Sequence, residues 1–149
     1  MRLSRLLLGS SVLCYVAYDI VSTLAAFNYL GTFEYEKSVL IREAFNIAGV
    51  PGFIIIKLAV SLLAIYAAYL LMERYERFRG LGAGVLSGAT TAGLFVGTSN
   101  LNIILRGNSI WLLGMDSGTV ATILIVGCTL VGLLFSGQLW RRPDVLKTN

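Results

Sequence analysis

The stretch VPGFIIIKLAVSLLAIYAAYLLM, residues 50–72, decides the fold, because it carries only one charged residue, Lys57. A run of about 20 apolar residues, folded as a helix, is long enough to cross the hydrocarbon core of a bilayer. Three further apolar runs of comparable length occupy residues 6–30, 81–105 and 119–140. We therefore expect an all-α fold, an integral membrane four-helix bundle that forms a single domain over residues 1–149.

The composition of the chain agrees with this fold and excludes several classes of function. Hydrophobic residues make up 56% of the chain and charged residues only 13%, against about 25% charged residues in soluble domains. Basic residues occur in short clusters and do not form a stripe interleaved with aromatic residues along one face, so we expect no nucleic-acid partner. The chain has no histidine, which is the commonest metal ligand and general base. We expect no catalytic residues, metal or cofactor.

The distribution of lysine and arginine predicts the orientation in the membrane, because short cytoplasmic loops are enriched in both residues. One side of the predicted bundle carries eight of them: Arg2, Arg5, Arg74, Arg77, Arg79, Arg141, Arg142 and Lys147. The other side carries three: Lys37, Arg42 and Arg106. This difference predicts a multi-pass protein of the cell membrane with both termini in the cytoplasm.

The first outer loop, residues 33–48, also shows a helical pattern. Its residues Leu40, Ala44, Ile47 and Ala48 recur at helical spacing, whereas Arg42, Glu43 and Asn46 fall on another face. Such a pattern is typical of a short amphipathic helix that lies in the membrane interface. We expect it either to pack on the bundle as a lid or to dock a partner.

Polar residues within the apolar runs are the candidates for a functional site. A charged residue near the bilayer centre costs at least ~2.5 kcal/mol, and only Asp19 and Lys57 lie clearly inside these runs. Tyr15, Ser22 and Thr23 accompany Asp19 at helical neighbour spacings, and Asn100 lies near the outer end of the third run. These residues are either a polar clamp between helices or part of an ion or proton path.

The depths of these residues predict one intramembrane polar cluster, Asp19, Ser22, Thr23, Lys57 and Asn100, in the outer half of the membrane. Side chains lean towards the N-terminus of their own helix, so Asp19 leans inward and Lys57 outward. This geometry opposes a direct contact between the two charges. The alternatives are a lysine that bends inward, a bridge through water or Ser22, or a lysine that reaches Glu34 at the interface.

The third run is rich in glycine. Gly84 with Gly88, and Gly93 with Gly97, are pairs of small residues four positions apart. Such pairs allow helix backbones to approach closely, within one bundle or between subunits. We predict that Gly88 and Gly93 each face another helix.

The order Asp19, Ser22-Thr23, Gly31, Glu34, Lys57 and Asn100 resembles a family of small prokaryotic multi-pass membrane proteins of unknown function. In that family an Asp and a Thr in helix one precede a Gly…Glu-x-Asn-Pro loop and a Lys in helix two. The resemblance covers the first three helices. This chain has Glu36 and Lys37 where the family loop has Asn and Pro. The resemblance implies a prokaryotic membrane protein and brings no activity with it.

Three functions remain open. Short loops, the absence of histidine and the glycine-rich helix favour a non-enzymatic accessory or assembly subunit, which associates with other membrane subunits or with copies of itself in the lipid bilayer. The alternative is a small ion- or proton-coupled transporter or channel that uses Asp19 and Lys57. The third is a membrane-embedded enzyme. A cavity beside the charged residues would favour transport, whereas apolar surroundings would favour the clamp.

Overall fold

The computed structural model describes residues 3–32, 36 and 38–140, without the side chains of residues 137–140. It contains four helical rods that are long and apolar enough to cross a membrane. The first rod joins α1 (Leu3–Ser11), a π-helical segment η1 (Val12–Tyr18) and α2 (Asp19–Leu30). The others are α3 (Val39–Arg74), α4 (Arg79–Arg106), which follows the short 3-10 turn η2 (Glu76–Phe78), and α5 (Ser117–Trp140). The predicted number of long apolar helices is therefore confirmed.

Glycines end two of these rods. Gly31 and Gly107 follow α2 and α4 with φ values of 71° and 74°, a left-handed conformation that glycine adopts without steric cost. Their N–H groups donate to the carbonyls of Phe27 and Ile103, each at 2.8 Å. The chain can therefore turn immediately after each rod, which keeps neighbouring helices antiparallel.

Gly49 divides α3 into two segments. Its backbone, with φ 62° and ψ −151°, lies in a region of conformational space that is essentially restricted to glycine. Pro51 follows at the start of the second segment, where its missing N–H removes no helical hydrogen bond. Residues 39–48 consequently form a separate short helix that precedes the apolar rod of residues 50–74.

The short helix of residues 39–48 presents a different face from the one that the sequence suggested. Ile41 and Phe45 pack on the core, and the Phe45 ring meets that of Phe27 edge to face at 5.2 Å. Leu40 and Ile47 are 58% and 83% exposed. The helix is thus apolar on two sides: Ile41 and Phe45 pack on the core, and the predicted face with Leu40 and Ile47 stays exposed.

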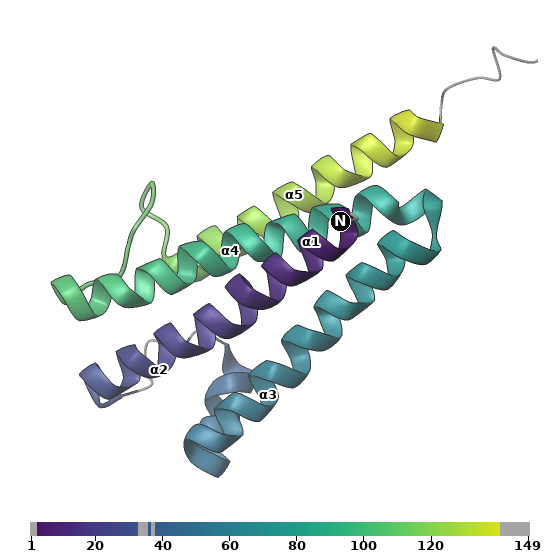
Figure 1. Ribbon diagram of the computed structural model, residues 1–149. Coiled ribbons are helices and arrows are strands. Elements are labelled where there is room, and N and C mark those ends of the chain that lie inside the picture. The colour runs from purple at the N-terminus through teal and green to yellow at the C-terminus, as the bar shows by residue number, and fades with distance from the viewer. Residues whose placement is uncertain (1–2, 33–35, 37, 141–149) are drawn as a thin grey trace, which may run out of the picture.

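The rods run side by side in an antiparallel arrangement (Figure 1). The terminal end of the molecule is where α1 begins, α5 ends and η2 joins α3 to α4, and the distal end is where α2 ends and α5 begins. Helix α4 is central, because it packs on the first rod, on α3 and on α5. Helix α5 packs on α4 and η2, without comparable packing on α3 among the described residues.

The apolar core lies between the first rod, α3 and α4. Its fully buried side chains include Phe53 and Leu86, and Val16, Ile65 and Met72 surround them. Ile65, Ala68 and Met72 extend this core along α3 towards the terminal end. The polar residues discussed next therefore lie beyond one end of a closely packed core.

Candidate functional site

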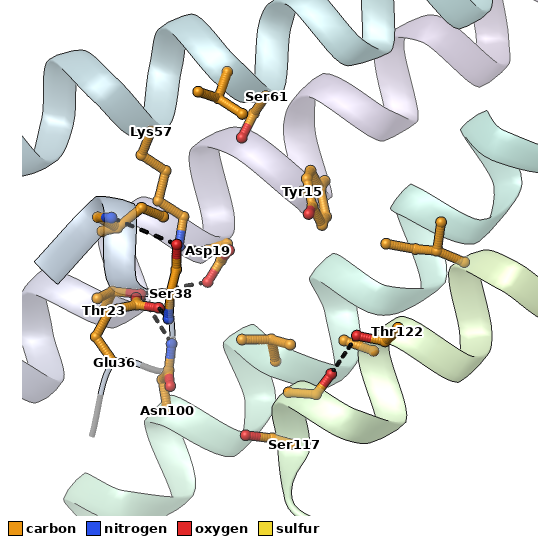
Figure 2. A pocket seen from close by; sticks show the side chains of 16 residues that line it. Tyr15, Asp19, Thr23, Glu36, Ser38, Lys57, Ser61, Asn100, Ser117 and Thr122 are labelled. Carbon is orange, nitrogen blue, oxygen red and sulfur yellow. Dashed lines mark hydrogen bonds and ion pairs between the residues drawn. The ribbon is translucent and has the colours of Figure 1, made fainter. Parts of the chain in front are cut away.

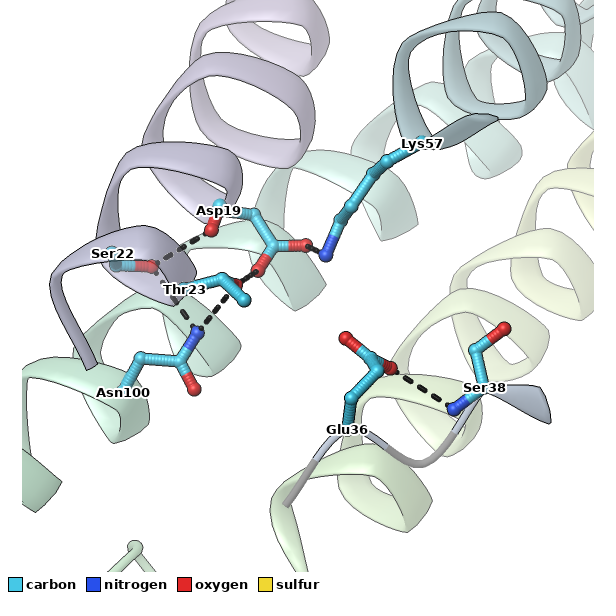
Figure 3. Close-up of polar contacts among 7 residues, drawn as sticks. All are labelled: Asp19, Ser22, Thr23, Glu36, Ser38, Lys57 and Asn100. Carbon is cyan, nitrogen blue, oxygen red and sulfur yellow. Dashed lines mark hydrogen bonds and ion pairs between the residues drawn. The ribbon is translucent and has the colours of Figure 1, made fainter. Parts of the chain in front are cut away.

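Asp19 and Lys57 form a direct ion pair between α2 and α3. The Lys57 Nζ lies 2.8 Å from Asp19 Oδ2, and only 9% and 7% of the two side chains is exposed. Figure 3 shows the ammonium of Lys57 directed at the carboxylate. Two charges so far removed from solvent stay stable only as a pair, because each alone would lack compensation.

The ion pair belongs to a hydrogen-bond network that connects α2 with α4. The Thr23 hydroxyl donates to Asp19 Oδ1 at 3.3 Å, and the Ser22 hydroxyl donates to the Asp19 carbonyl at 3.1 Å. The Asn100 amide donates to both hydroxyl oxygens, at 3.2 Å and 3.0 Å. The structure thus brings together all five residues of the predicted polar cluster, and three rods contribute to it.

The direct contact between the charges differs from the sequence expectation. Lys57 leans towards its own N-terminus as expected, because its Nζ lies 5.5 Å from the centre of the Phe53 ring, one turn earlier. The expectation assumed that α2 ends level with the start of the second segment of α3. The pair at 2.8 Å shows that the Lys57 side chain reaches Asp19 across the difference in depth that the sequence predicted.

A cavity of about 340 Å³ lies beside the ion pair. Asp19, Thr23, Lys57 and Asn100 line it, and α5 contributes residues from Ser117 to Ile125. Figure 2 shows that the first rod, α3, α4 and α5 all place side chains around it. Further polar side chains in its lining are Tyr15, Glu36, Ser38, Ser61, Ser117 and Thr122. The site is therefore larger than the predicted cluster and more polar than a clamp requires.

Glu36 is a site residue that the sequence reasoning missed. Its Oε1 accepts the Ser38 N–H at 3.0 Å, and its carboxylate faces the cavity from the connection between α2 and α3 (Figure 3). Glu34, the predicted loop partner of Lys57, lies outside the described residues. One sequence feature could have indicated Glu36: it is a carboxylate two residues before the Ser38 N-cap, at the same end of the bundle as the Asp19 cluster.

Two buried side chains of the cavity have polar atoms without a hydrogen-bond partner among the described residues. Ser61 is 7% exposed, yet its hydroxyl makes no hydrogen bond with any of them. Asn100 is also 7% exposed, and only its NH₂ group is bonded. Within the described residues, no side-chain nitrogen or oxygen that is fully shielded from solvent lacks a hydrogen-bond partner. The two unbonded groups are therefore accessible from the cavity, where they can bond to water or to a polar ligand.

The four predicted packing glycines of α4 divide between two neighbours. A Cβ built on Gly88 would lie 2.8 Å from the Cα of Ile125 in α5, and Gly84 also meets α5. A Cβ on Gly93 would lie 2.5 Å from the backbone of Cys14 in η1, and Gly97 meets the ring of Tyr18. The half of α4 near the terminal end therefore approaches α5, whereas the other half approaches η1.

The π-helical segment η1 separates the two parts of the first rod. A π-helical turn contains more residues than an α-helical turn, so it changes which face the following residues occupy. Here η1 ends at Tyr18, immediately before Asp19, and it carries Tyr15 of the cavity. The sequence pattern gave no sign of this segment, which lies next to the charged pair as such turns often do at functional sites.

No protein-family model, curated protein or solved structure matches this chain. The resemblance to the small prokaryotic membrane-protein family thus stays a prediction. Among the described residues, no three His, Cys, Asp or Glu side chains are grouped closely enough to hold a metal ion. The site is thus defined by its own geometry, a buried ion pair next to a polar cavity.

Proposed function

We propose that this chain is a four-span protein of the cell membrane with both termini in the cytoplasm. Four long apolar helices support the spans. The exposed arginines at the terminal end are Arg5, Arg74, Arg77 and Arg79, against Arg42 and Arg106 at the distal end. This excess of positive charge assigns the terminal end to the cytoplasm and the cavity to the outer half of the membrane.

Within that membrane, the protein acts as a small ion- or proton-coupled transporter that binds a polar solute beside Asp19 and Lys57. The observation that carries this proposal is the cavity of about 340 Å³ that the ion pair lines. Small-molecule sites typically have volumes of about 300–1,000 Å³ with a few placed polar groups. A clamp between helices needs no such space.

The closed core favours a transporter over an open channel. Ile65, Ala68 and Met72 are 2–4% exposed, so apolar side chains close the packing along α3 between the cavity and the terminal end. A solute bound from the distal side therefore needs a conformational change to cross. Alternating access of this kind is the usual behaviour of membrane transporters with a site near the bilayer midplane.

Accessibility of the cavity to water tests the premise. In a variant with Cys14 and Cys128 replaced by alanine, we expect Ser61→Cys to react with a membrane-impermeant thiol reagent added outside. Ile65→Cys, one turn away and 2% exposed in the wild type, serves as the matched control and should not react. Equal labelling of both positions, or of neither, contradicts the premise.

Flux across proteoliposomes tests the transport itself. A pH-sensitive dye inside the vesicles should respond when a cationic, anionic or neutral solute of the accepted class is added outside. The double variant Asp19→Asn/Lys57→Met removes both buried charges together, and we expect its vesicles to give no response. A wild-type response no larger than that of the double variant, for every solute class, contradicts the proposal.

Orientation is tested separately by single cysteines in the same cysteine-free background. A cysteine at Ser109, in the connection between α4 and α5, should react with reagent added outside intact cells. Cysteines at Arg77 and after Trp140 should react only once the cell membrane is opened. Labelling of Ser109 and the C-terminus from the same side would contradict the four-span topology.

A second candidate function, an assembly subunit that associates with a second copy of itself, is favoured by the groove between α4 and α5. The groove measures about 590 Å³ and is lined by small residues such as Gly80, Ala83 and Ser87. Gly127 on its α5 side has nothing within 4 Å of an added Cβ, so another helix can approach there.

Native mass spectrometry from mild detergent tests this second candidate function. A dimer that the Gly127→Leu substitution dissociates supports it, whereas monomer or lipid adducts alone contradict it.

A further inference from the structure

Among the residues that the structure describes, the charges that line the cavity do not balance. Two carboxylates, Asp19 and Glu36, face one ammonium, that of Lys57, and Lys57 is already paired with Asp19 at 2.8 Å. Glu36 makes no ion pair within the described residues; its Oε1 accepts one backbone N–H. In surroundings of low dielectric, an uncompensated carboxylate attracts a cation strongly.

The positive potential at the N-terminus of α5, beside the cavity, is already compensated by a carboxylate of the chain. Helix α5 begins beside the cavity at Ser117, and helix N-termini favour anions. However, Asp116 Oδ1 accepts the N–H groups of Gly118 and Thr119 at 2.9 Å and 3.1 Å. Because a protein carboxylate fills this position, an anionic ligand gains little from the helix end.

The orientation of the Asn100 amide places a second acceptor in the cavity. The hydroxyl protons of Ser22 and Thr23 are both donated to Asp19, so these hydroxyls have only lone pairs to offer to Asn100. The Asn100 NH₂ must therefore face them, as the bonds of 3.2 Å and 3.0 Å show, and its carbonyl oxygen points away from them (Figure 3). This oxygen lies on a 7% exposed side chain and accepts no hydrogen bond from the described residues.

The chain itself shows how this site holds an ammonium group. The Lys57 ammonium contacts a carboxylate oxygen and lies 5.5 Å from the centre of the Phe53 ring, a combination of anion and aromatic face that favours cations. Across the cavity, the Glu36 carboxylate faces this ammonium without pairing with it (Figure 3). The space between them is lined by acceptors and hydroxyl groups, which complement a ligand that donates hydrogen bonds.

We propose that the cavity binds a small primary ammonium compound, with its ammonium held by the Glu36 carboxylate and the Asn100 carbonyl oxygen. The proposal rests on the transport function inferred above and names its substrate class. The hydroxyls of Ser61 and Tyr15 contact the remainder of the ligand in a space of about 340 Å³. The ammonium belongs either to a free amine or to the headgroup of a lipid, since both carry the same group.

Binding of radiolabelled methylammonium to the full chain in phosphatidylcholine nanodiscs tests the proposal. We expect saturable binding that tetramethylammonium competes at least about tenfold more weakly, because it has the charge but no N–H donors. Glu36→Gln should weaken methylammonium binding by about tenfold or more, since a hydrogen bond to a charged group is lost. Glu43→Gln, at an exposed carboxylate on the neighbouring short helix, is the matched control and should bind as the wild type does.

Lipid composition separates the two sources of the ammonium. Nanodiscs that contain phosphatidylethanolamine should show a lower apparent methylammonium affinity if the headgroup occupies the cavity, and an unchanged affinity if the ligand is a free amine. Either result is compatible with the ammonium site, and the pair of nanodiscs assigns its source.

Other outcomes overturn the inference or the function beneath it. Equal methylammonium binding by Glu36→Gln and the wild type, or equal competition by tetramethylammonium, overturns the ammonium site. Binding or flux with acetate or glycerol, without any response to methylammonium, also overturns it and leaves the transport function standing. If no solute class shows binding or flux, and the Ser61→Cys variant does not react with the thiol reagent, the transport function is contradicted as well.

Discussion

Two polar clusters join the first rod to α4, and they differ in charge and in surroundings. Near the terminal end, Ser11 is fully buried; its Oγ lies 2.8 Å from the Leu86 carbonyl and 3.2 Å from Thr90 Oγ1. The Thr90 hydroxyl donates to the same carbonyl at 2.9 Å. This cluster is neutral, and none of its members lines the cavity. The Asp19 cluster makes the same kind of connection with charges and beside the cavity.

The difference between the two clusters shows which features a structural connection between helices needs and which features indicate a ligand-binding site. Hydroxyl groups that bond to backbone carbonyls connect two helices at small cost, and each such bond contributes about 0.6 kcal/mol in membrane proteins. The Ser11 cluster shows that this chain connects the first rod to α4 without any charge, and the Asp19–Lys57 pair adds a charged contact from the first rod to α3. The Asp19–Lys57 pair and the cavity beside it are therefore the features that structural support alone leaves unexplained.

The largest expected effect comes from separating the two charges. Asp19→Asn or Lys57→Met alone leaves its partner buried and uncompensated, so each should lower the free energy of unfolding by about 3 kcal/mol. The double variant should lose less than the sum of the two, because neither charge then remains unpaired. Unfolding in mixed micelles with increasing SDS measures all four proteins.

A strictly additive cycle would contradict this expectation, since it would mean that the two charges do not depend on each other. A neutral effect of both single variants would show that water in the cavity already compensates each charge. Either result would remove the energetic contrast between the Asp19 cluster and the Ser11 cluster.

The next effect concerns the contact of α4 with η1, which holds both clusters in place. Gly93→Leu should cost about 1–3 kcal/mol, because the new side chain overlaps the backbone of η1 and forces the rods apart. Gly127→Leu, in open space on α5, is the matched control and should change the unfolding midpoint little in monomeric protein. Equal midpoints for the two variants would show that α4 does not pack closely on η1.

The sequence alone was sufficient to predict the four long helices and the charged residues at the centre of the site. The length of the apolar runs determines where helices can cross a membrane, and a charge inside such a run is conspicuous because it is costly. Asp19, Lys57 and Asn100 were therefore found together with Ser22 and Thr23. The start of the second segment of α3 also agrees with the sequence, because the predicted apolar run begins at residue 50, directly after the break at Gly49.

The cavity and its outer residues were beyond the reach of a sequence pattern. Ser61 and Glu36 become site residues only because the packing of the rods brings them to the same cavity as Asp19, which no local periodicity encodes. The face of residues 39–48 that packs on the core, with Ile41 and Phe45, was also not distinguished by the sequence. In helices as apolar as these, the residues that face neighbouring helices are no more apolar than those that face outward, so polarity does not distinguish the two sides.

The smallest expected effects compare one bond from each cluster directly. Ser11→Ala removes a hydroxyl from the neutral cluster, but the Leu86 carbonyl keeps the Thr90 hydroxyl as its donor, so the loss should be about 0.6 kcal/mol. Asn100→Ala removes the amide that donates to the Ser22 and Thr23 hydroxyls, of which Thr23 bonds to the Asp19 carboxylate, and it should cost about 1.5 kcal/mol. The two variants also differ in function: Asn100→Ala should weaken methylammonium binding, whereas Ser11→Ala should leave it unchanged. If Ser11→Ala impaired binding as much as Asn100→Ala, the two clusters would form one coupled unit, and the distinction between clamp and site would be lost.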